Sequence, residues 1–169
     1  SIEADGALQF EVIAKIMDNG NEITRWLNAD GTLSESQVIL TIKEGGFTTT
    51  DGGKTYTKTF ENVPTGEYTV NETNTKIEGY NFIQESSVTT DTTTVTKDTS
   101  AGIELVNEYE KKTGSLQLTK TIKGDVTPEE AAGLLTFEVK TTVTENGEEV
   151  EKWLGKDGKL SDEKVQLNR

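Results

Sequence analysis

The sequence predicts an all-β protein built from tandem β-sandwich domains, and three observations support this fold class. Short runs rich in Val, Ile, Thr, Phe and Tyr alternate between apolar and polar residues, as half-buried strands do. Asn-Gly, Asp-Gly, Gly-Gly and Pro-Thr-Gly turns separate these runs. A long internal repeat then shows that the pattern occurs twice. Many short strands with regular turns are typical of a β-sandwich.

The predicted strands follow one another with one helical interruption. A short helix is expected at T-P-E-E-A-A, where Thr127 is the cap, Pro128 takes the first position and Glu130 the third. The Thr-rich stretch 86–100 resembles a mucin-like linker in composition, but it lacks proline, so an exposed strand with loops is the preferred interpretation. Strands are expected at residues 8–16, 36–42, 55–61, 67–73, 79–84, 103–109, 115–122, 134–143 and 163–167.

Composition limits the chemistry that the chain can perform. With 30 acidic and 17 basic residues the net charge is −13, which repels phosphate backbones, so nucleic acid is not an expected partner. No apolar run reaches the roughly 20 residues that a membrane span needs, so no membrane insertion is expected. The chain has neither Cys nor His, which removes disulfides, thiolate metal sites and the usual bases. We expect no cofactor and no metal site.

The repeat defines the expected domains. G-A-L-Q-F-E-V from Gly6 returns as G-L-L-T-F-E-V from Gly133, which lies 127 residues later, and the match continues through Trp26 and Trp153. We therefore expect a first domain at 1–109, a linker at 110–113 and the N-terminal part of a second domain at 114–169. The strand at 114–123 has its first-copy counterpart ahead of Ser1, so the first domain is expected to lack its opening strand.

Three polar residues fall on apolar strand faces when side chains are assigned alternately to the two sides. Each has an ordinary explanation, because a lysine can snorkel, an asparagine can bond loop backbone and a glutamate can pair with arginine. The occurrence of all three on apolar faces of one repeat nevertheless indicates a shared chemical role. Glu72 shares its face with Tyr68 and Val70, Asn107 with Ile103, Leu105 and Tyr109, and Lys120 with Leu116, Leu118 and Ile122.

These three residue types can react together if they are buried. Desolvation favours the neutral amine of a lysine and the protonated form of a glutamate. A neutral amine is a nucleophile, a carboxamide is an electrophile, and a protonated carboxyl can polarise the carboxamide and relay protons as ammonia leaves. The product would be an amide cross-link between two strands.

The same residues carry a family resemblance. F-E-N-V-P-T-G-E-Y-T-V-N-E-T, from Phe60 to Thr73, resembles the hairpin and "E-box" of the Cna-B and pilin isopeptide domains of Gram-positive surface proteins. G-S-L-Q-L-T-K-T-I-K-G resembles their lysine-bearing first strand, and I-E-L-V-N-E-Y their closing strand. The resemblance implies immunoglobulin-like, transthyretin-like sandwiches, with Glu72 as the catalytic acid, Asn107 as the acceptor and Lys120 as the nucleophile.

The three residues come from two different copies of the repeat. Glu72 and Asn107 belong to the first domain and Lys120 to the second, whose own acid and asparagine would lie beyond Arg169. Lys15 is expected to face outward and cannot replace the missing lysine. In the family the first and last strands are parallel, which needs a crossover of a dozen or more residues, so a bond from Lys120 to Asn107 within one chain is not expected. Strand exchange between chains remains open.

Other motifs have simpler interpretations. D-N-G-N-E and N-A-D-G-T-L-S offer oxygen ligands, but without calcium-loop spacing they are expected to be hairpin turns. Trp26 and Trp153 could stack on carbohydrate, although a shared packing role explains their recurrence equally well. The N-E-T sequon at Asn71 lies within a predicted strand, so glycosylation is not expected there.

The expected function is structural. The sequence favours stalk or pilus-shaft domains of a Gram-positive adhesin, extracellular and anchored to the cell wall, whose partners are the neighbouring domains. Bond formation would occur once per domain, so this would not be an enzyme with turnover. The alternative is an adhesin module that binds a host protein or glycan, although the host ligand is unknown and aromatic residues make up only 7% of the chain. A carboxylate-based glycosidase would need a second acid facing Glu72, and the sequence identifies none.

Overall fold

A computed structural model describes residues 6–145 and 147–168, and the chain divides into two compact units between Lys112 and Thr113. The regular secondary structure of both units is almost all antiparallel strand, which confirms the all-β class. The predicted helix is confirmed as α2 (Pro128–Ala131), where Thr127 and Glu130 form a capping box. Glu110 and Lys111, which were expected in the linker, instead belong to strand β8 (Tyr109–Lys111).

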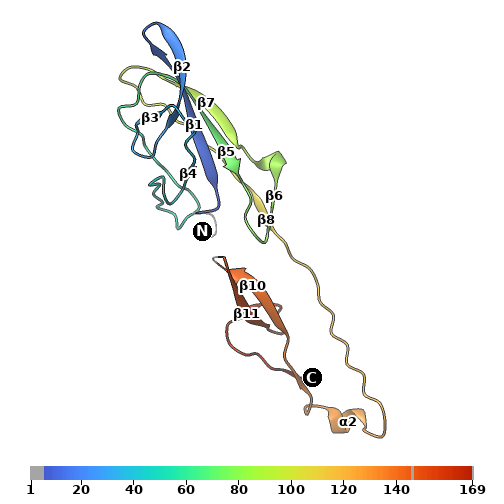
Figure 1. Cartoon of the computed structure of the whole chain (residues 1–169). Helices are drawn as coiled ribbons and strands as arrows, with labels where there is room; N and C mark the ends of the chain where they lie inside the picture. Colours follow the sequence, from blue (N-terminus) through green and yellow to red (C-terminus); the bar gives the residue numbers. More distant parts are fainter. Residues whose placement is uncertain (1–5, 146, 169) are drawn as a thin grey trace. The chain divides into compact units, whose positions relative to one another are not determined.

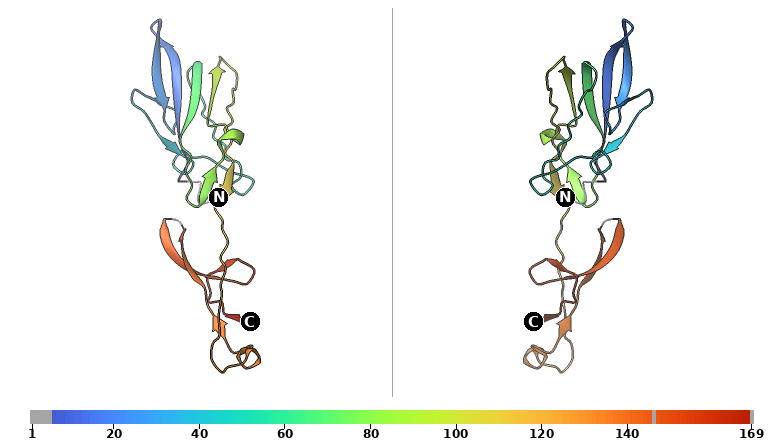
Figure 2. Two further views of the ribbon diagram at one scale, coloured as in Figure 1. Left: turned by 90° about the vertical axis from the view of Figure 1, so that its right-hand side faces the viewer. Right: turned by 90° about the vertical axis from the view of Figure 1, so that its left-hand side faces the viewer.

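The first unit contains a six-stranded sheet (Figure 1). Its long neighbours β1 (Gln9–Asp18) and β5 (Gly66–Asn74) pair antiparallel. Asn19 and Gly20 join β1 to β2 (Asn21–Leu27), and their φ values of 49° and 80° suit a two-residue hairpin turn. Figure 2 shows these blue and green strands side by side. The strand order is β3 (Leu33–Ser34), β2, β1, β5, β7 (Thr90–Val95), and β4 (Leu40–Thr41) also pairs with β1.

A smaller sheet in the same unit pairs β6 (Tyr80–Phe82) with β8. The chain between these strands forms the 3-10 helix η1 (Gln84–Ser86) and then β7. Just before β8, Val106 forms an antiparallel bridge with Val88. Odd-numbered side chains from Ile103 to Tyr109 are half-buried and even-numbered ones are exposed, as the alternation predicted.

Two neighbouring hydrophobic clusters connect these sheets. The first is formed by buried side chains of the six-stranded sheet, and the second lies toward β6 and β8, with Phe10 of β1 contacting both. Lys15 of β1 is half exposed, as predicted, so it does not replace a buried lysine. The buried members are Val12, Ala14, Leu27, Leu40 and Tyr68 in the first cluster and Leu8, Ile42 and Ile77 in the second.

The second unit repeats the strand register of the first. Phe10 pairs with Leu40, and Phe137 with Leu167; Trp26 pairs with Ser34, and Trp153 with Ser161. Each second pair lies 127 residues after the first, so the sequence repeat is also a repeat in register. The strands of this unit are β9 (Thr136–Phe137), β10 (Lys140–Glu145), β11 (Glu148–Leu154), β12 (Leu160–Ser161) and β13 (Leu167–Asn168).

Several strands differ from the sequence-based expectation because a strand requires a partner. The expected strand at 115–122 is irregular and exposed, and that at 55–61 contributes only the Thr57 bridge to Thr48. The strands at 36–42, 103–109 and 163–167 are shorter than expected, and 134–143 is divided between β9 and β10. Conversely, β2 and β11 were not expected because charged residues obscure their alternation. Strand β7 confirms the exposed-strand interpretation of the Thr-rich stretch.

Gly66 provides a test of the close approach between β1 and β5. Its φ is +155°, and a Cβ there would collide with the Lys15 carbonyl oxygen and lie 3.0 Å from Ile16 Cγ2. We expect Gly66→Ala to lower the free energy of unfolding by about 1–3 kcal/mol, measured by urea titration of Trp26 fluorescence in a Trp153→Phe background. Gly102→Ala is the matched control, because nothing lies within 4 Å of its Cβ. Equal stability of the two variants would contradict this packing.

Candidate functional site

Glu72 lies on the inward face of β5, as the alternation predicted. It is opposite Phe10 in the register with β1, and its backbone N–H donates to the Thr89 carbonyl oxygen at 2.8 Å. Its side chain is half-buried. Burial raises the pKa of the Glu72 carboxyl, and a hydrogen bond from Asn107 opposes this increase. The protonated form therefore persists to higher pH than in an exposed glutamate.

Asn107 reaches Glu72 from the segment between the Val106 bridge and β8. Its Nδ2 donates to Glu72 Oε1 at 2.6 Å and to the Tyr109 hydroxyl oxygen at 3.2 Å. The Val88–Val106 bridge fixes the preceding residue and therefore the face on which Asn107 lies. The structure brings together two residues that are 35 positions apart in sequence and that were predicted to form one site.

Tyr109 positions the carboxamide, a role that the sequence did not predict. Its hydroxyl donates to the Thr75 carbonyl oxygen at 2.6 Å while accepting from Asn107. The Phe82 ring lies 5.6 Å from the Tyr109 ring, centroid to centroid, and holds it from the side. Burial raises the pKa of the Tyr109 hydroxyl, so it remains a donor. The alternation that places Asn107 and Tyr109 on the same inward face could have indicated this role in the sequence. The hydrogen bond from Tyr109 to the Thr75 carbonyl oxygen could not have been found there, because it depends on the fold.

Two oxygen atoms of the site have no hydrogen-bond partner in the described part of the chain. They are Glu72 Oε2 and Asn107 Oδ1, and both are buried. Buried polar atoms are nearly always paired, because an unpaired one costs roughly 1–3 kcal/mol. Both atoms are acceptors when the carboxyl is ionised, so a group that carries N–H donors fits the site best.

Lys120 does not belong to the unit that holds Glu72 and Asn107. It lies in the second unit, in the irregular segment between β8 and α2, and its side chain is exposed. The three predicted site residues are thus divided, with the carboxyl and carboxamide in one unit and the amine in the other.

A second carboxyl–carboxamide pair lies on the opposite face of β5, between β5 and β1. Glu11 of β1 is opposite Asn71 of β5, and Asn71 Nδ2 donates to Glu11 Oε1 at 3.3 Å. Gln37 and Trp26 donate to Glu11 Oε2 at 2.6 and 3.1 Å. Hydrogen bonds, the largest from Gln37, lower the pKa of Glu11. The two glutamates therefore have opposite pKa shifts, which makes Glu11 a natural control.

The other motifs take part in local structure. Asn71 of the sequon lies in β5 and also accepts a hydrogen bond from Thr90 at 2.6 Å. Asp30 Oδ1 accepts from the backbone N–H of Thr32 at 3.0 Å, as in a turn. Among residues 6–145 and 147–168, no cluster of three or more Asp, Glu, His or Cys side chains is arranged to hold a metal ion. The described helices include none that is long and apolar enough to cross a membrane.

The raised pKa of Glu72 predicts a specific pH dependence. The folded chain binds this proton more tightly than the unfolded chain, so the associated stability is complete below the ordinary pKa of 4.5 and is lost as pH rises through the folded value. We expect the natural chain to lose stability relative to Glu72→Gln between about pH 4 and pH 7, measured by urea unfolding. Glu11→Gln should show the opposite trend, with the natural chain losing relative stability as pH falls. Parallel curves for Glu72→Gln would contradict the assignment.

Comparison with known proteins identifies a family for this unit. Residues 19–110 match the family described as a domain of unknown function, DUF5979. The searches against curated proteins and against solved structures found no match. The matched segment covers more than half of the 169 residues and includes both Glu72 and Asn107, so the chain belongs to the DUF5979 family of domains of unknown function.

Proposed function

We propose that the first unit is a self-cross-linking domain of a Gram-positive surface stalk or pilus shaft, in which Glu72 promotes an amide bond between Asn107 and a lysine. One observation carries this proposal. Asn107 Nδ2, the nitrogen that would leave as ammonia, already donates to Glu72 Oε1 at 2.6 Å in a half-buried site. The resemblance to Cna-B and pilin domains supports the same assignment.

The reaction can be written with the residues of the site. A neutral lysine Nζ attacks Asn107 Cγ, while the protonated Glu72 carboxyl stabilises the charge that develops on Oδ1. The carboxyl takes a proton from the attacking nitrogen and delivers one to Nδ2, along the contact seen between these groups. A Cγ–Nζ bond forms, the Cγ–Nδ2 bond breaks and one ammonia leaves. The carboxyl ends as it began, so the step needs no outside reactant.

The environment of Glu72 supports this role. Partial desolvation keeps its proton bound at higher pH, and the same surroundings would favour the neutral form of an adjacent lysine. The unpaired Asn107 Oδ1 offers an acceptor to an incoming amine, and the unpaired Glu72 Oε2 can carry the proton of the protonated carboxyl. Glu11, by contrast, is held ionised by its donors on the opposite face and lacks these properties.

A covalent tie of this kind suits a load-bearing surface protein. It would connect strands that are distant in sequence, so tension could pass through the bond without unfolding the sheet. A chain without cysteine cannot use disulfides for this purpose, and an amide also resists reduction. The common register of the two units supports a tandem array of similar β domains.

The binding-module alternative has weaker support. All aromatic side chains of the chain are buried or half-buried, so the described surface offers no exposed aromatic platform for a host ligand. None of the exposed large apolar residues in the described chain is aromatic, and several lie in the irregular segment before α2.

Bond formation can be tested by supplying the lysine strand within the chain. By the 127-residue repeat, residues 114–132 stand directly before Gly133, which is the counterpart of Gly6. We expect a chain in which a copy of residues 114–132 replaces residues 1–5 to weigh one ammonia less than its composition. Intact mass spectrometry measures this loss, and peptide mapping should join the added lysine to Asn107.

Three variants of that extended chain identify the participants. Asn107→Ala and Glu72→Gln should keep the full calculated mass, whereas Glu11→Gln should still lose one ammonia. Retention of full mass by the extended chain, in a folded state, would refute the proposed function. Loss of ammonia in Glu72→Gln would refute the role of the carboxyl.

The bond should also stabilise the extended chain. A cross-link that closes a loop of roughly 100 residues contributes about 4–5 kcal/mol by restricting the unfolded state. We expect the extended chain to exceed its Asn107→Ala variant in free energy of unfolding by that order, in the presence or absence of reductant. Urea titration at neutral pH measures the difference, and a gap that disappears with reductant would contradict an amide bond.

A further inference from the structure

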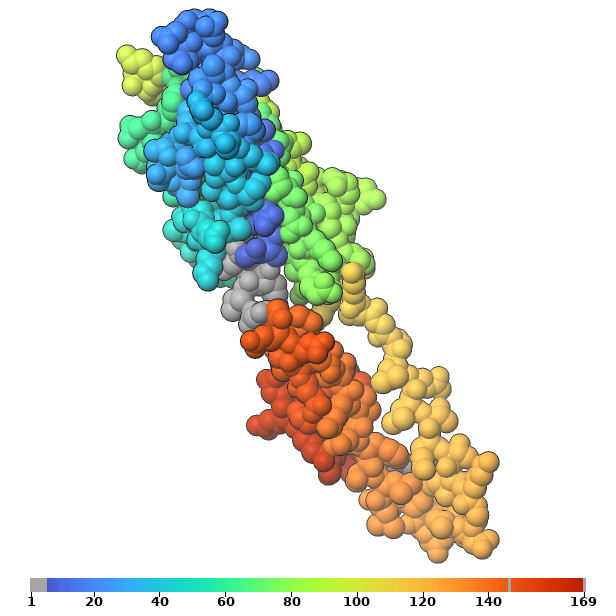
Figure 3. All heavy atoms as spheres, in the orientation of Figure 1, coloured from blue at the N-terminus to red at the C-terminus, as the bar shows by residue number. Residues whose placement is uncertain are grey.

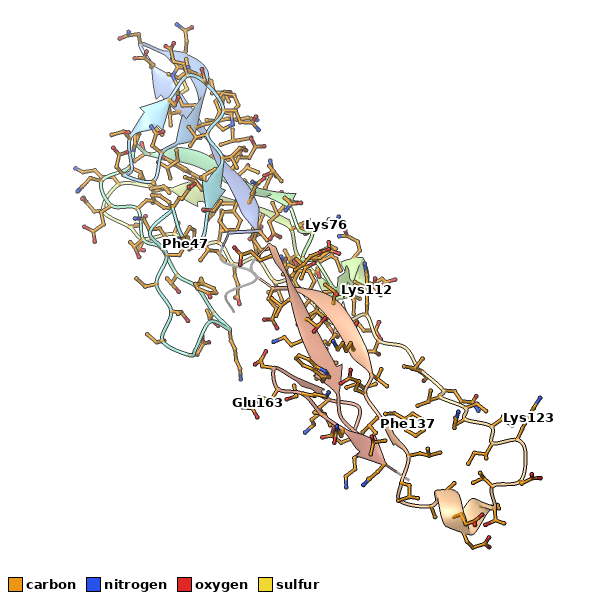
Figure 4. The ribbon with its side chains drawn as sticks, turned by 60° about the horizontal axis from the view of Figure 1, so that its bottom comes forward. Phe47, Lys76, Lys112, Lys123, Phe137 and Glu163 are labelled. Carbon is orange, nitrogen blue, oxygen red and sulfur yellow. The ribbon has the colours of Figure 1, made fainter. Side chains whose placement is uncertain are left out.

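The turn between β1 and β2 holds a pair of residues that the proposed function does not use. Asn19 and Gly20 are both exposed, and the φ of Asn19 is 49°, in the left-handed region that asparagine tolerates. The last pair of the β1–β2 ladder is Asp18 with Asn21, so neither turn residue belongs to the ladder. Figure 3 shows the blue hairpin at one end of the first unit, and in Figure 4 side chains at its far end point away from the neighbouring strands.

The side chain of Asn19 and the backbone of Gly20 are both accessible. No hydrogen bond joins the Asn19 carboxamide to another residue in the described part of the chain. Gly20 has no side chain to shield its amide nitrogen, and no described atom lies within 4 Å of the position that a Cβ would take there. The asparagine side chains that donate hydrogen bonds are those of Asn28, Asn71, Asn74 and Asn107.

We propose that Asn19 is a modification site, at which the Gly20 amide nitrogen attacks the side chain and water then converts the asparagine to aspartate or isoaspartate. The Gly20 nitrogen loses its proton and bonds to Asn19 Cγ, while the Cγ–Nδ2 bond breaks and Nδ2 leaves with that proton as ammonia. The resulting cyclic succinimide takes up one water molecule, which opens either of its two carbonyl groups. One water therefore enters and one ammonia leaves, without an oxidant or a cofactor.

The place of this pair at the end of a hairpin favours the attack. Gly20 N reaches Asn19 Cγ only when the peptide unit between the two residues rotates. Such a rotation disturbs the neighbouring pair of Asp18 and Asn21, whose side chains are both exposed, so little buried surface is lost. Segments with few buried contacts open at a low cost in free energy. The reaction therefore requires only local opening of the turn.

Asn62 is a natural control for this site. It is exposed like Asn19, and its φ of 58° also lies in the left-handed region. The residue that follows it is Val63, whose branched side chain packs against the first hydrophobic cluster. That side chain shields the Val63 amide nitrogen and restrains the backbone beside it. The two asparagines thus share exposure and conformation but differ in the accessibility of the next nitrogen.

The two products affect the hairpin differently. Aspartate keeps the main chain and adds a negative charge close to Asp18 and Glu22, so the net charge of −13 becomes one unit more negative. Isoaspartate carries the main chain through its Cγ, which adds one carbon atom to a two-residue turn. A longer turn does not suit the tight pairing of Asp18 with Asn21. The isoaspartate form should therefore open the end of the hairpin, whereas the aspartate form should retain it.

Isotope labelling tests this site in the full chain. We expect incubation at mildly alkaline pH in water enriched in heavy oxygen, followed by digestion in ordinary water, to show label at residue 19 in the tryptic peptide 16–25. Both aspartate and isoaspartate should be present, and fragmentation distinguishes Asn19 from Asn21. Asn62, in the peptide 59–76, should remain unlabelled over the same period. Asn146 is also followed by glycine, but it lies outside the described residues and in a different peptide.

Two variants identify the reacting groups. Asn19→Gly should abolish the label and keep the hairpin, because glycine adopts a positive φ freely. Gly20→Asn should slow labelling severalfold, because asparagine also tolerates a positive φ but shields the attacking nitrogen. An unlabelled residue 19 in the natural chain, or equal labelling of Asn62, would overturn the inference. Asn19→Gly should leave the cross-link of the extended chain unchanged, because that bond uses neither residue of the turn.

Hydrogen exchange tests the effect on the hairpin. The isoaspartate fraction of the aged chain should exchange its amide hydrogens severalfold faster near the β1–β2 turn than the Asn19→Asp variant, which carries the same charge. Exchange in the six-stranded sheet away from this turn should be the same in both. Equal exchange near the turn would contradict the predicted opening.

Discussion

The hydrogen bond from Asn107 Nδ2 to Glu72 Oε1 is the interaction on which the functional interpretation depends. It joins β5 of the six-stranded sheet to the segment before β8, at a point where both side chains are half-buried. A carboxyl and a carboxamide alone cannot satisfy all their polar atoms there, and Glu72 Oε2 and Asn107 Oδ1 remain unpaired. Native proteins rarely retain such a deficit without a reason, so the site has the character of an acceptor for a third group.

Glu72 and Glu11 lie on opposite faces of the β1–β5 pair of strands, and each accepts a hydrogen bond from an asparagine, Asn107 of the segment before β8 and Asn71 of β5 respectively. Glu72 faces inward beside Phe10, and burial raises its pKa, whereas Glu11 faces outward and its hydrogen bonds lower its pKa. Residue type is the same in both pairs, so the face of the sheet decides the chemistry. A shift of one residue in this register would exchange the two faces and remove the inward acid.

The sequence predicted those features that depend on alternation and on short-range signals. It identified the inward faces of Glu72 and Asn107, the outward face of Lys15 and the capping box at Thr127. It failed where a strand depends on a distant partner, since residues 115–122 alternate correctly but remain irregular. The Tyr109 hydroxyl contact with Thr75 and the two unpaired oxygens depend on side-chain placement across the fold, which no local pattern contains.

Comparison of the second unit with the first shows which contacts form between neighbouring strands and which require distant strands. It reproduces the β1–β2 hairpin register, and Lys152 pairs with Asp162 as Arg25 pairs with Glu35. It also pairs Lys164 with Glu138 at 2.8 Å, where the first unit pairs Gln37 with Glu11. These contacts involve only sequence positions that are present in both copies of the repeat. The proposed cross-linking site would instead combine β5, the segment before β8 and a lysine-bearing strand, so the hairpins could form independently while the site would require the whole repeat. A bond that forms only after these strands assemble would therefore lock a fold that is already correct.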